Sequence, residues 1–586
     1  MCGIVGYAGN IETACGKPLE VCLQGLERLE YRGYDSAGVA LTAPGMDKVV
    51  VRKKAGRLKN LVEDIERKPM PLATVGIGHT RWATNGEPSD VNAHPHTSMD
   101  GKVAIIHNGI IENASQLRLD LQAEGYRFAS ATDTEVAAKL LGKIVDKIIA
   151  DEGKPDLFKA VRRMARMLEG AFTILATDCR QPDIVVGARH DSPLVVGLGE
   201  GENFLGSDVA AFVAYTKRAM EVDQDQAVCV SADKVIVADF NGNVVENPKT
   251  YTVDWDASAA EKGGWDSFMD KEIHEDPAAV QRTLLGRFDT NGDITLDEVR
   301  IDEHDFKAID KIIVVACGTA SYAGQVAKYA IEHWVRIPVE IELAHEFRYR
   351  DPILTPRTLV VAISQSGETM DTLMALRHAR EQGSKVLAIC NTQGASIPRE
   401  SDAVLYTHAG PEVAVASTKA FVAQITAAYL LGLYLAQVKG AMFRDEIHQM
   451  LDSLKDMPRK IQWVLDTQPK TIQAAAERMV NANSFLFLGR HVGYPVALEG
   501  ALKLKEIAYT FTEGFAAGEL KHGPIALVDE GEPVVFIVPP QRGRNVLHAK
   551  VISGIEEVKA RGAYIIAVAE QGDPDVERYA DVVCWR

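Results

Sequence analysis

The sequence has few cysteines, and no two of them have CxxC spacing. Eight cysteines are spread over 586 residues, from Cys2 to Cys584. Paired CxxC spacing is typical of zinc sites, and closely spaced cysteines are typical of small disulfide-rich domains, so both classes are excluded. No basic region followed by an apolar stretch opens the chain, so no signal peptide is predicted. These features indicate a protein of the reducing cytoplasm.

An excess of positive charge is lacking too, and long hydrophobic runs are almost absent. The net charge is −17, from 81 acidic and 64 basic residues, which argues against general binding of nucleic acid. One uncharged run, Ala420–Val438, approaches the length of a membrane span, but it contains Gln424, Thr426 and Gln437. We therefore predict a helix buried in the core of a large domain and no membrane association.

The first 240 residues consist of short β-branched runs. Two helical patterns interrupt them, at Pro18–Leu29 and Asp133–Ile149. Strands that follow strands predict an α+β layered domain of antiparallel sheets over residues 1–240. The next segment is acidic, contains Gly-Gly and lacks strand alternation, so residues 241–300 are predicted to be a linker that passes into a helix.

From residue 301 onward, strands alternate with long helices, which predicts parallel α/β sheets. This half repeats itself at an offset of about 173–179 residues: KIIVVACGTASYAG matches SFLFLGRHVGYPVA, and KVLAIC matches YIIAVA. Two copies of one domain are therefore predicted, at 301–445 and 446–586. The first copy continues past Thr407 into a loop and the apolar helix, whereas the second stops at Arg586. We expect the second copy to be C-terminally incomplete.

One loop of the first copy has the composition of an anion site. ISQSGETMDT follows an apolar strand, opens a helix and supplies hydroxyl and amide groups, which together with backbone N–H groups suit a phosphomonoester. The alternative is simple capping of the helix by Ser366 and Thr369. The equivalent loop of the second copy, VPPQRGR, lacks these hydroxyls, which favours phosphate binding. A calcium-like stretch, Asp289–Arg300, has Ile294 where glycine belongs and Arg300 where glutamate belongs, so no metal site is predicted.

Cysteine at position 2 raises a specific possibility. Removal of Met1 would give Cys2 a free α-amine beside its thiol, a nucleophile and a base on one residue. The plain alternative is a small hydrophobic residue at the start of a strand.

Several motifs together resemble one family over the whole chain. MCGIVGY, GHTRWAT, HNGIIEN and TDTE resemble the N-terminal-nucleophile glutaminase domain, an αββα sandwich, of the glutamine–fructose-6-phosphate aminotransferases. SQSGET, EGALKLKE and GELKHGP resemble the two sugar-isomerase (SIS) domains of that family. The resemblance implies synthesis of glucosamine 6-phosphate and glutamate from fructose 6-phosphate and glutamine, the first step of amino-sugar synthesis. It implies no metal and no organic cofactor.

The resemblance also assigns residues of the glutaminase. Cys2 would be the nucleophile, and the Asn108 side chain and the Gly109 N–H, in HNGI, would stabilise the oxyanion formed when its thiolate attacks the amide of glutamine.

Arg81 would bind the carboxylate of glutamine, and bidentate guanidinium geometry suits that role. Asp133 would bind its ammonium group, Thr84 and His94 would line the pocket, and Trp82 would gate ammonia. The plain alternative for Arg81 or Asp133 taken singly is a surface ion pair.

In the isomerase half, Lys503 and Glu506 are three residues apart on a predicted helix. They form either a plain ion pair or a proton-transfer pair, and the resemblance makes Glu506 the base with Lys503 beside it. His522 would help to open the sugar ring and would come from the neighbouring subunit of a homodimer. The resemblance assigns sugar-phosphate contacts to Thr319, Ser364, Gln365, Ser366, Thr369 and the backbone of Val415.

Two other functions stay open at this stage. The family has a C-terminal tail whose lysine forms a Schiff base with the sugar, and no such lysine follows Arg586. The chain is then a fragment, or an uncoupled glutaminase that releases ammonia to water. A non-catalytic sugar-phosphate sensor is the second alternative, although it would have no use for Cys2, Arg81 and Asp133 together.

Overall fold

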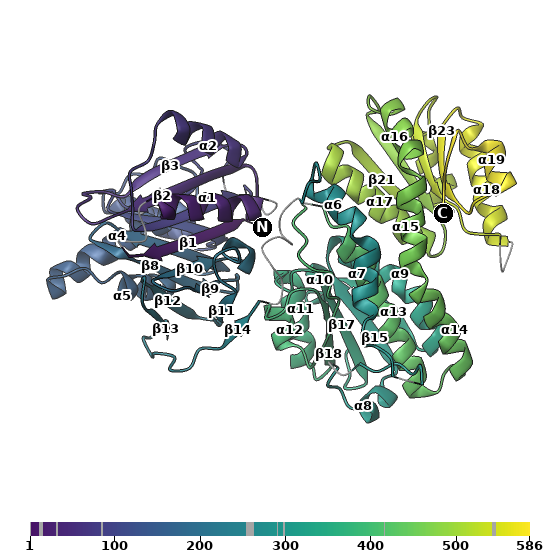
Figure 1. Cartoon of the computed structure of the whole chain (residues 1–586), viewed down its shortest axis with the longest axis horizontal. Coiled ribbons are helices and arrows are strands. Elements are labelled where there is room, and N and C mark those ends of the chain that lie inside the picture. The colour runs from purple at the N-terminus through teal and green to yellow at the C-terminus, as the bar shows by residue number, and fades with distance from the viewer. Residues whose placement is uncertain are drawn as a thin grey trace. The chain divides into compact units, whose positions relative to one another are not determined.

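The computed structural model describes residues 2–10, 16–30, 33–83, 86–253, 263–289, 291–296, 299–414, 416–541 and 546–586. The chain divides into two compact units, Met1–Glu261 and Lys262–Arg586, whose elements are labelled in Figure 1.

The first unit contains two antiparallel sheets. The order of the eight-stranded sheet is β14 (Thr250–Thr252), β11 (Arg218–Glu221), β9 (Val195–Leu198), β10 (Glu202–Gly206), β1 (Gly3–Gly9), β4 (Val75–Arg81), β2 (Ser36–Thr42) and β3 (Val50–Ala55). The order of the six-stranded sheet is β13 (Val235–Asp239), β12 (Gln226–Val230), β8 (Gln181–His190), β7 (Phe172–Asp178), β6 (Val103–Gly109) and β5 (His96–Thr97). The helices are α1 (Lys17–Leu29), α2 (Leu58–Arg67), α3 (Ala114–Ala123), α4 (Asp133–Glu152) and α5 (Leu157–Ala165).

Alternating side chains divide this unit into layers. On β1, Val5 packs with residues of α1 and α2, whereas Ile4 packs between the two sheets with Ile106 and Leu175. On β6, Ile105 faces the opposite way, toward α4 and α5. Because successive side chains of a strand point to opposite faces, each sheet has one face on a helical layer and one on the other sheet. The predicted αββα sandwich is confirmed.

The second unit contains two five-stranded parallel sheets. The first has the order β16 (Val339–Leu343), β15 (Lys311–Ala316), β17 (Thr358–Ser364), β18 (Lys385–Cys390) and β19 (Ala403–Tyr406). The second has the order β21 (Phe511–Ala516), β20 (Ser484–Gly489), β22 (Pro533–Ile537), β23 (Tyr564–Ala569) and β24 (Val582–Trp585). Numbered within its own copy, each sheet has the strand order 2-1-3-4-5, so the predicted repeat is confirmed. Ligands of such open sheets bind beyond the carboxyl ends of the strands.

Helices surround both sheets in this unit. Those before and around the first sheet are α6 (Phe268–His274), α7 (Asp276–Leu284), α8 (Glu303–Ala308), α9 (Gly318–Val335), α10 (Ala344–Phe347), α11 (Met370–Glu381), α12 (Ser396–Glu400) and α13 (Lys419–Lys439). The others are α14 (Arg444–Lys455), α15 (Met457–Thr467), α16 (Pro469–Arg478), α17 (Gly493–Ala508), α18 (Val546–Lys559) and α19 (Pro574–Tyr579). Between α17 and α18 lie two short 3-10 turns, η4 (Glu519–His522) and η5 (Pro524–Leu527).

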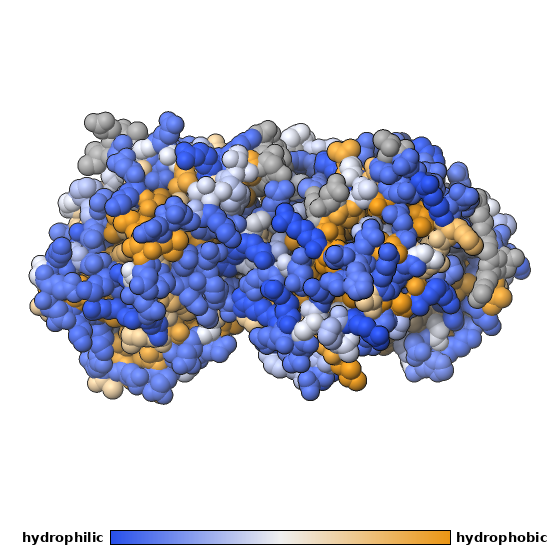
Figure 2. Space-filling model, turned by 90° about the horizontal axis from the view of Figure 1, so that it is seen from below, coloured by the Kyte–Doolittle hydropathy of each residue, from blue (hydrophilic) through white to orange (hydrophobic). Residues whose placement is uncertain are grey.

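The long apolar helix α13 is a core element of the first copy. By length and composition it could cross a membrane, and 61% of its most apolar window is buried inside the protein. It packs against α9 and α7, and Leu430 and Leu433 share a core with Ile312 and Leu359 of the sheet. The predicted buried helix is therefore present. Figure 2 shows one face of the molecule, on which hydrophobic residues gather in patches between hydrophilic ones.

The predicted linker, 241–300, contains regular structure. Its strand β14 pairs with β11 of the first unit, and its helix α7 packs against α13 of the second. Residues 254–262 lie outside the described residues. The predicted domain boundaries at 240, 300 and 445 stay predictions.

Candidate active site

Pairing of β1 with β4 places Cys2 beside the end of β4. Gly3 on β1 pairs with Thr80 on β4, so the residue before Gly3 meets Arg81 and Trp82. The Trp82 N–H donates to the Cys2 Sγ at 3.2 Å, and the thiol lies 3.6 Å from the Trp82 carbonyl oxygen. Burial raises the pKa of the Cys2 thiol, while the bond to the Trp82 backbone and the nearby Arg81 oppose that rise. The thiol thus needs a base close by to become a thiolate.

The second sheet brings Asn108 to the same place. Asn108 lies near the end of β6, and its Nδ2 donates to the Cys2 carbonyl oxygen at 2.8 Å. Gly109 follows it with φ 115°, and a Cβ there would lie 2.0 Å from the Ala171 carbonyl oxygen. Only glycine fits this conformation and this approach. Asn108 on β6 of the six-stranded sheet therefore contacts Cys2, the residue before β1 of the eight-stranded sheet. The roles of Asn108 and Gly109 as oxyanion donors stay predictions.

Two charged residues border this site. Arg81 is 3% exposed and donates from Nη2 to the Gly86 carbonyl oxygen at 3.1 Å. Asp133 is the first residue of α4, and its Oδ2 accepts the Ile111 N–H at 3.0 Å. This bond ties α4 to the chain just after Gly109. Thr84, the other predicted pocket residue of this stretch, lies outside the described residues.

His94 belongs to a buried group of histidines. Its ring centroid lies 4.3 Å from that of His79 and 5.3 Å from that of His96. Burial lowers the pKa of His94 well below the usual range, so its imidazole is neutral. No described hydrogen bond joins His94 to Cys2, Arg81 or Asp133, and its role in glutamine binding stays a prediction.

In the second unit, the predicted helix of EGALKLKE is confirmed as part of α17. The Lys503 Nζ donates to the Glu506 carboxylate at 2.6 Å and lies 3.7 Å from a Glu499 oxygen. Thr319, in the first turn of α9, donates its hydroxyl to Glu499 Oε1 at 3.1 Å. Glu499 therefore links Lys503 of the predicted proton-transfer pair to Thr319, a predicted sugar-phosphate contact.

Sequence reasoning missed Glu499. Its side chain is 8% exposed, and burial raises its pKa to about 7, with Lys503 acting against that rise. Its Oε2 is buried without a hydrogen-bond partner among the described residues. The spacing of four residues to Lys503 was a visible signal of an interacting pair on one helix face, although nothing in the sequence indicated the contact with Thr319.

The predicted anion loop lies at the carboxyl end of β17. The hydroxyls of Ser364 and Thr369 lie 3.1 Å apart, and the Gly367 N–H donates to Ser364 Oγ at 3.0 Å. Thr369 is the N-cap of α11 but makes no side-chain capping bond, and Ser366 Oγ accepts the Glu368 N–H, which precedes the helix. Capping of α11 by these hydroxyls is therefore not observed. Gln365 holds the loop through its carbonyl oxygen, which accepts the Asn391 N–H.

One further predicted residue, His522, is not brought to Lys503 and Glu506. His522 ends η4 and is exposed, and no described hydrogen bond or ion pair joins it to either residue. Val415 lies outside the described residues. The loop before Val415 is held by Glu272 of α6, whose Oε1 accepts the N–H groups of Val413 and Ala414 at 2.5 and 3.1 Å. Sequence reasoning missed this contact because it had placed Glu272 in the linker.

Known protein families match both units of the chain. A glutamine amidotransferase domain model matches residues 79–214, and a SIS domain model matches 306–434 and 478–584. Proteins named glutamine–fructose-6-phosphate aminotransferase [isomerizing] are 62% identical over 583 residues in Corynebacterium diphtheriae and 58% identical over 581 residues in Streptomyces coelicolor. Each match covers 99% of this chain and 92% of the relative. The chain belongs to the glutamine–fructose-6-phosphate aminotransferase family.

Solved structures agree with this membership. The C-terminal domain of the glucosamine-fructose-6-phosphate aminotransferase of Francisella tularensis is similar to this chain with a TM-score of 0.52 and 39% identity. The match covers 55% of this chain and 89% of that one. Within this aminotransferase chain, the two SIS matches span the two parallel sheets, and the amidotransferase match contains Arg81, Asn108 and Asp133.

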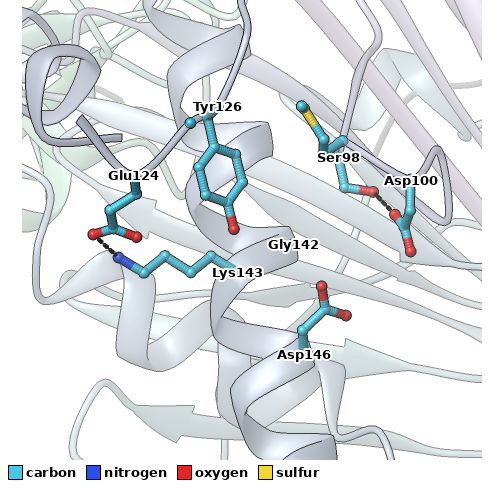
Figure 3. Close-up of a pocket in the computed structure, with 9 residues that line it drawn as sticks. Ser98, Asp100, Glu124, Tyr126, Gly142, Lys143 and Asp146 are labelled. Atoms are coloured by element: carbon cyan, nitrogen blue, oxygen red, sulfur yellow. Dashed lines mark hydrogen bonds and ion pairs between the residues drawn. The ribbon is translucent and has the colours of Figure 1, made fainter. Parts of the chain in front are cut away.

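A cleft elsewhere in this aminotransferase does not belong to the site. It has a volume of about 410 Å³ and lies between α4 and the turns at Ser98 and Gly125, as Figure 3 shows. Its charged lining is already paired. Lys143 donates to Glu124 at 2.5 Å, Arg180 pairs with Asp146 at 3.0 Å, and Asp100 accepts the Ser98 hydroxyl. None of its lining residues is a predicted site residue.

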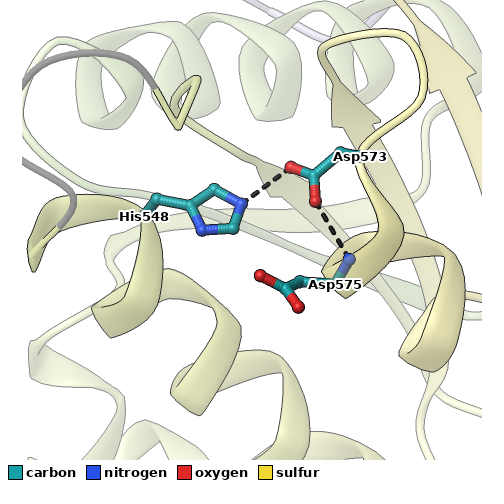
Figure 4. A group of neighbouring side chains, drawn as sticks. All are labelled: His548, Asp573 and Asp575. Carbon is teal, nitrogen blue, oxygen red and sulfur yellow. Dashed lines mark hydrogen bonds and ion pairs between the residues drawn. The ribbon is translucent and has the colours of Figure 1, made fainter.

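One group of possible metal ligands is occupied by hydrogen bonds. His548 Nε2 donates to Asp573 Oδ2 at 2.7 Å (Figure 4), and Asp573 Oδ1 accepts the N–H groups of Asp575 and Val576. Asp573 is thus the N-cap of α19, joined by His548 to α18. These hydrogen bonds give His548 and Asp573 a structural role, which is to cap α19 and join it to α18.

Proposed function

We propose that this chain transfers the amide nitrogen of glutamine to fructose 6-phosphate and isomerises the product to glucosamine 6-phosphate, releasing glutamate. The observation that carries the proposal is the meeting of Cys2, Trp82 and Asn108 in one unit and of Thr319, Glu499 and Lys503 in the other. The names of the relatives support a coupled aminotransferase rather than an uncoupled glutaminase or a sensor. Glutamine and fructose 6-phosphate are the proposed substrates.

In the glutaminase step, the α-amine of Cys2 takes the thiol proton after Met1 is removed. The thiolate attacks the amide carbon of glutamine, and the carbonyl π electrons move to oxygen. The Asn108 amide and the Gly109 N–H stabilise that oxyanion. The carbon–nitrogen bond then breaks as the nitrogen takes the proton and leaves as ammonia, and water hydrolyses the thioester to glutamate. Arg81 binds the substrate carboxylate and Asp133 its ammonium group, with Thr84 and His94 lining the pocket and Trp82 gating ammonia.

In the isomerase step, Ser364, Gln365, Ser366, Thr369 and Thr319 hold the phosphate. His522 of a neighbouring copy helps to open the ring, so a homodimer is part of the proposal, and the Val415 backbone contacts the sugar. Ammonia adds to carbon 2 and water leaves, which gives an imine. Glu506 then moves a proton from carbon 1 to carbon 2, while the hydroxyl proton of carbon 1 passes to the imine nitrogen, so that carbon 1 becomes the aldehyde and carbon 2 bears the amine. Lys503 donates to the Glu506 carboxylate at 2.6 Å and holds that base in place.

Mass spectrometry of the N-terminus tests the glutaminase half. Incubation with 6-diazo-5-oxo-L-norleucine, a glutamine analogue that alkylates a thiolate with loss of dinitrogen, should modify the peptide that begins at Cys2, and no Met1 should remain. Excess glutamine should protect Cys2. Retention of Met1 with full glutamine hydrolysis, or labelling of another cysteine in place of Cys2, would contradict the mechanism.

A further inference from the structure

His79 is a buried residue of β4 that the proposed mechanism does not use. It is fully buried, and its Nε2 lies 2.9 Å from the His107 carbonyl oxygen and 3.0 Å from Asn108 Oδ1. A carbonyl oxygen can only accept a hydrogen bond, so Nε2 must carry the ring proton. The other ring nitrogen, Nδ1, is buried without a partner among the described residues, as expected of the unprotonated nitrogen.

The fixed proton on His79 decides which way the Asn108 amide faces. A ring N–H that points at Asn108 requires the amide oxygen on that side, which leaves Nδ2 to face Cys2. The observed 2.8 Å bond from Nδ2 to the Cys2 carbonyl oxygen has this orientation. Turning the amide over would put its NH₂ group against the His79 N–H and its oxygen against the Cys2 carbonyl. Both contacts would be repulsive in a buried site.

The surroundings of His79 hold its ring in this orientation. The ring of His94 packs on it at 4.3 Å between centroids, and the His107 carbonyl oxygen accepts from the same N–H. Burial lowers the pKa of His79 to about 3, so the ring stays neutral through the physiological range. Among the described residues, His79 is the one hydrogen-bond donor to Asn108 Oδ1.

We infer that His79 is a positioning residue that holds the Asn108 amide with its N–H groups toward the oxyanion formed at Cys2. The inference rests on the proposed function, because it takes Asn108 as an oxyanion donor. The effect of His79 is confined to the tetrahedral intermediate. The oriented Asn108 N–H adds little to the binding affinity for glutamine or glutamate, but it stabilises the charged intermediate strongly.

The test compares ligands with and without a tetrahedral centre. Glutamate γ-semialdehyde forms a tetrahedral adduct with a thiolate, whereas glutamate does not. In His79→Leu, which has no donor, we expect glutaminase kcat to fall about 100-fold and the inhibition constant of the semialdehyde to rise by about 10-fold to 100-fold. The inhibition constant of glutamate should change by less than about threefold. His79→Gln, which retains an N–H donor, should recover most of the lost kcat.

Two further variants make the outcome specific. Because His79 acts through Asn108, the double variant His79→Leu with Asn108→Ala should be no slower than Asn108→Ala alone. The matched control is His96→Gln, a buried histidine of the same group that bonds Thr132 and not Asn108, and it should retain wild-type semialdehyde affinity. If His79→Leu does not fold, His79→Met replaces it, because its unbranched side chain adapts to irregular cavities.

Three results would overturn the inference: equal loss of semialdehyde and glutamate affinity in His79→Leu, no loss of either, or multiplicative losses in the double variant. A failure of the proposed function looks different. In that case Asn108→Ala itself would leave semialdehyde affinity unchanged, and the inference would fall with it.

Discussion

Replacing Cys2 with alanine should abolish use of glutamine and leave binding of fructose 6-phosphate unchanged. Alanine is small enough for Met1 still to be removed, so the variant retains a free α-amine and loses only the nucleophile. Loss of a nucleophile typically lowers kcat by several orders of magnitude, and we expect about 10⁴-fold or more here. Glutamate release measures the first effect, and titration calorimetry with fructose 6-phosphate measures the second.

The control for this variant is Cys229→Ala, a half-buried cysteine on β12 of the same unit. It should leave glutamine hydrolysis within about twofold of wild type, since Cys229 packs at the margin of the core on the helical side of its sheet and is not a predicted site residue. Sugar-phosphate binding should survive in Cys2→Ala because its predicted residues belong to the other compact unit. A parallel loss of fructose 6-phosphate binding would contradict this division of labour.

Replacing Glu506 with glutamine should stop the isomerase step and spare the glutaminase. Glutamine has the shape of glutamate but cannot accept the proton that moves from carbon 1. General base catalysis typically contributes about 10²-fold to 10⁴-fold, and we expect a loss of this size in amino-sugar formation. Exchange of solvent deuterium into carbon 1 of the sugar, followed by NMR, measures the proton transfer directly.

Glu513→Gln is the matched control, because Glu513 is an exposed glutamate on the neighbouring strand β21. It should exchange deuterium at the wild-type rate. Wild-type exchange in Glu506→Gln would remove Glu506 from the role of base. A loss of glutamine hydrolysis in that variant would show instead that the two sites are not separable.

The fold could be predicted to the level of layers and repeats. Before Phe240 the sequence shows short alternating runs, and after Ile301 it shows strands that alternate with helices. These periodicities are visible within short stretches of sequence, so the sandwich and the two parallel sheets could be predicted. The meeting of Cys2 with Asn108 was accessible only through the family resemblance. The two residues are 106 positions apart and lie on different sheets.

The missed residues share one physical feature. The roles of Glu272, His79 and Glu499 come from partners far away in the sequence: Val413, Asn108 and Thr319. Local patterns explain each of them as an ordinary helix or strand residue. Only the packing of elements reveals that Glu272 holds a loop and that His79 orients an amide. Burial then gives the Glu272 carboxyl a pKa of about 7.

Transfer of labelled nitrogen tests the central claim most directly. The protein is incubated with fructose 6-phosphate and glutamine that carries nitrogen-15 in its side-chain amide, and the products are analysed by NMR and mass spectrometry. The account predicts nitrogen-15 bonded to carbon 2 of glucosamine 6-phosphate, together with unlabelled glutamate. Label found only in free ammonium, with no amino sugar formed, would contradict it.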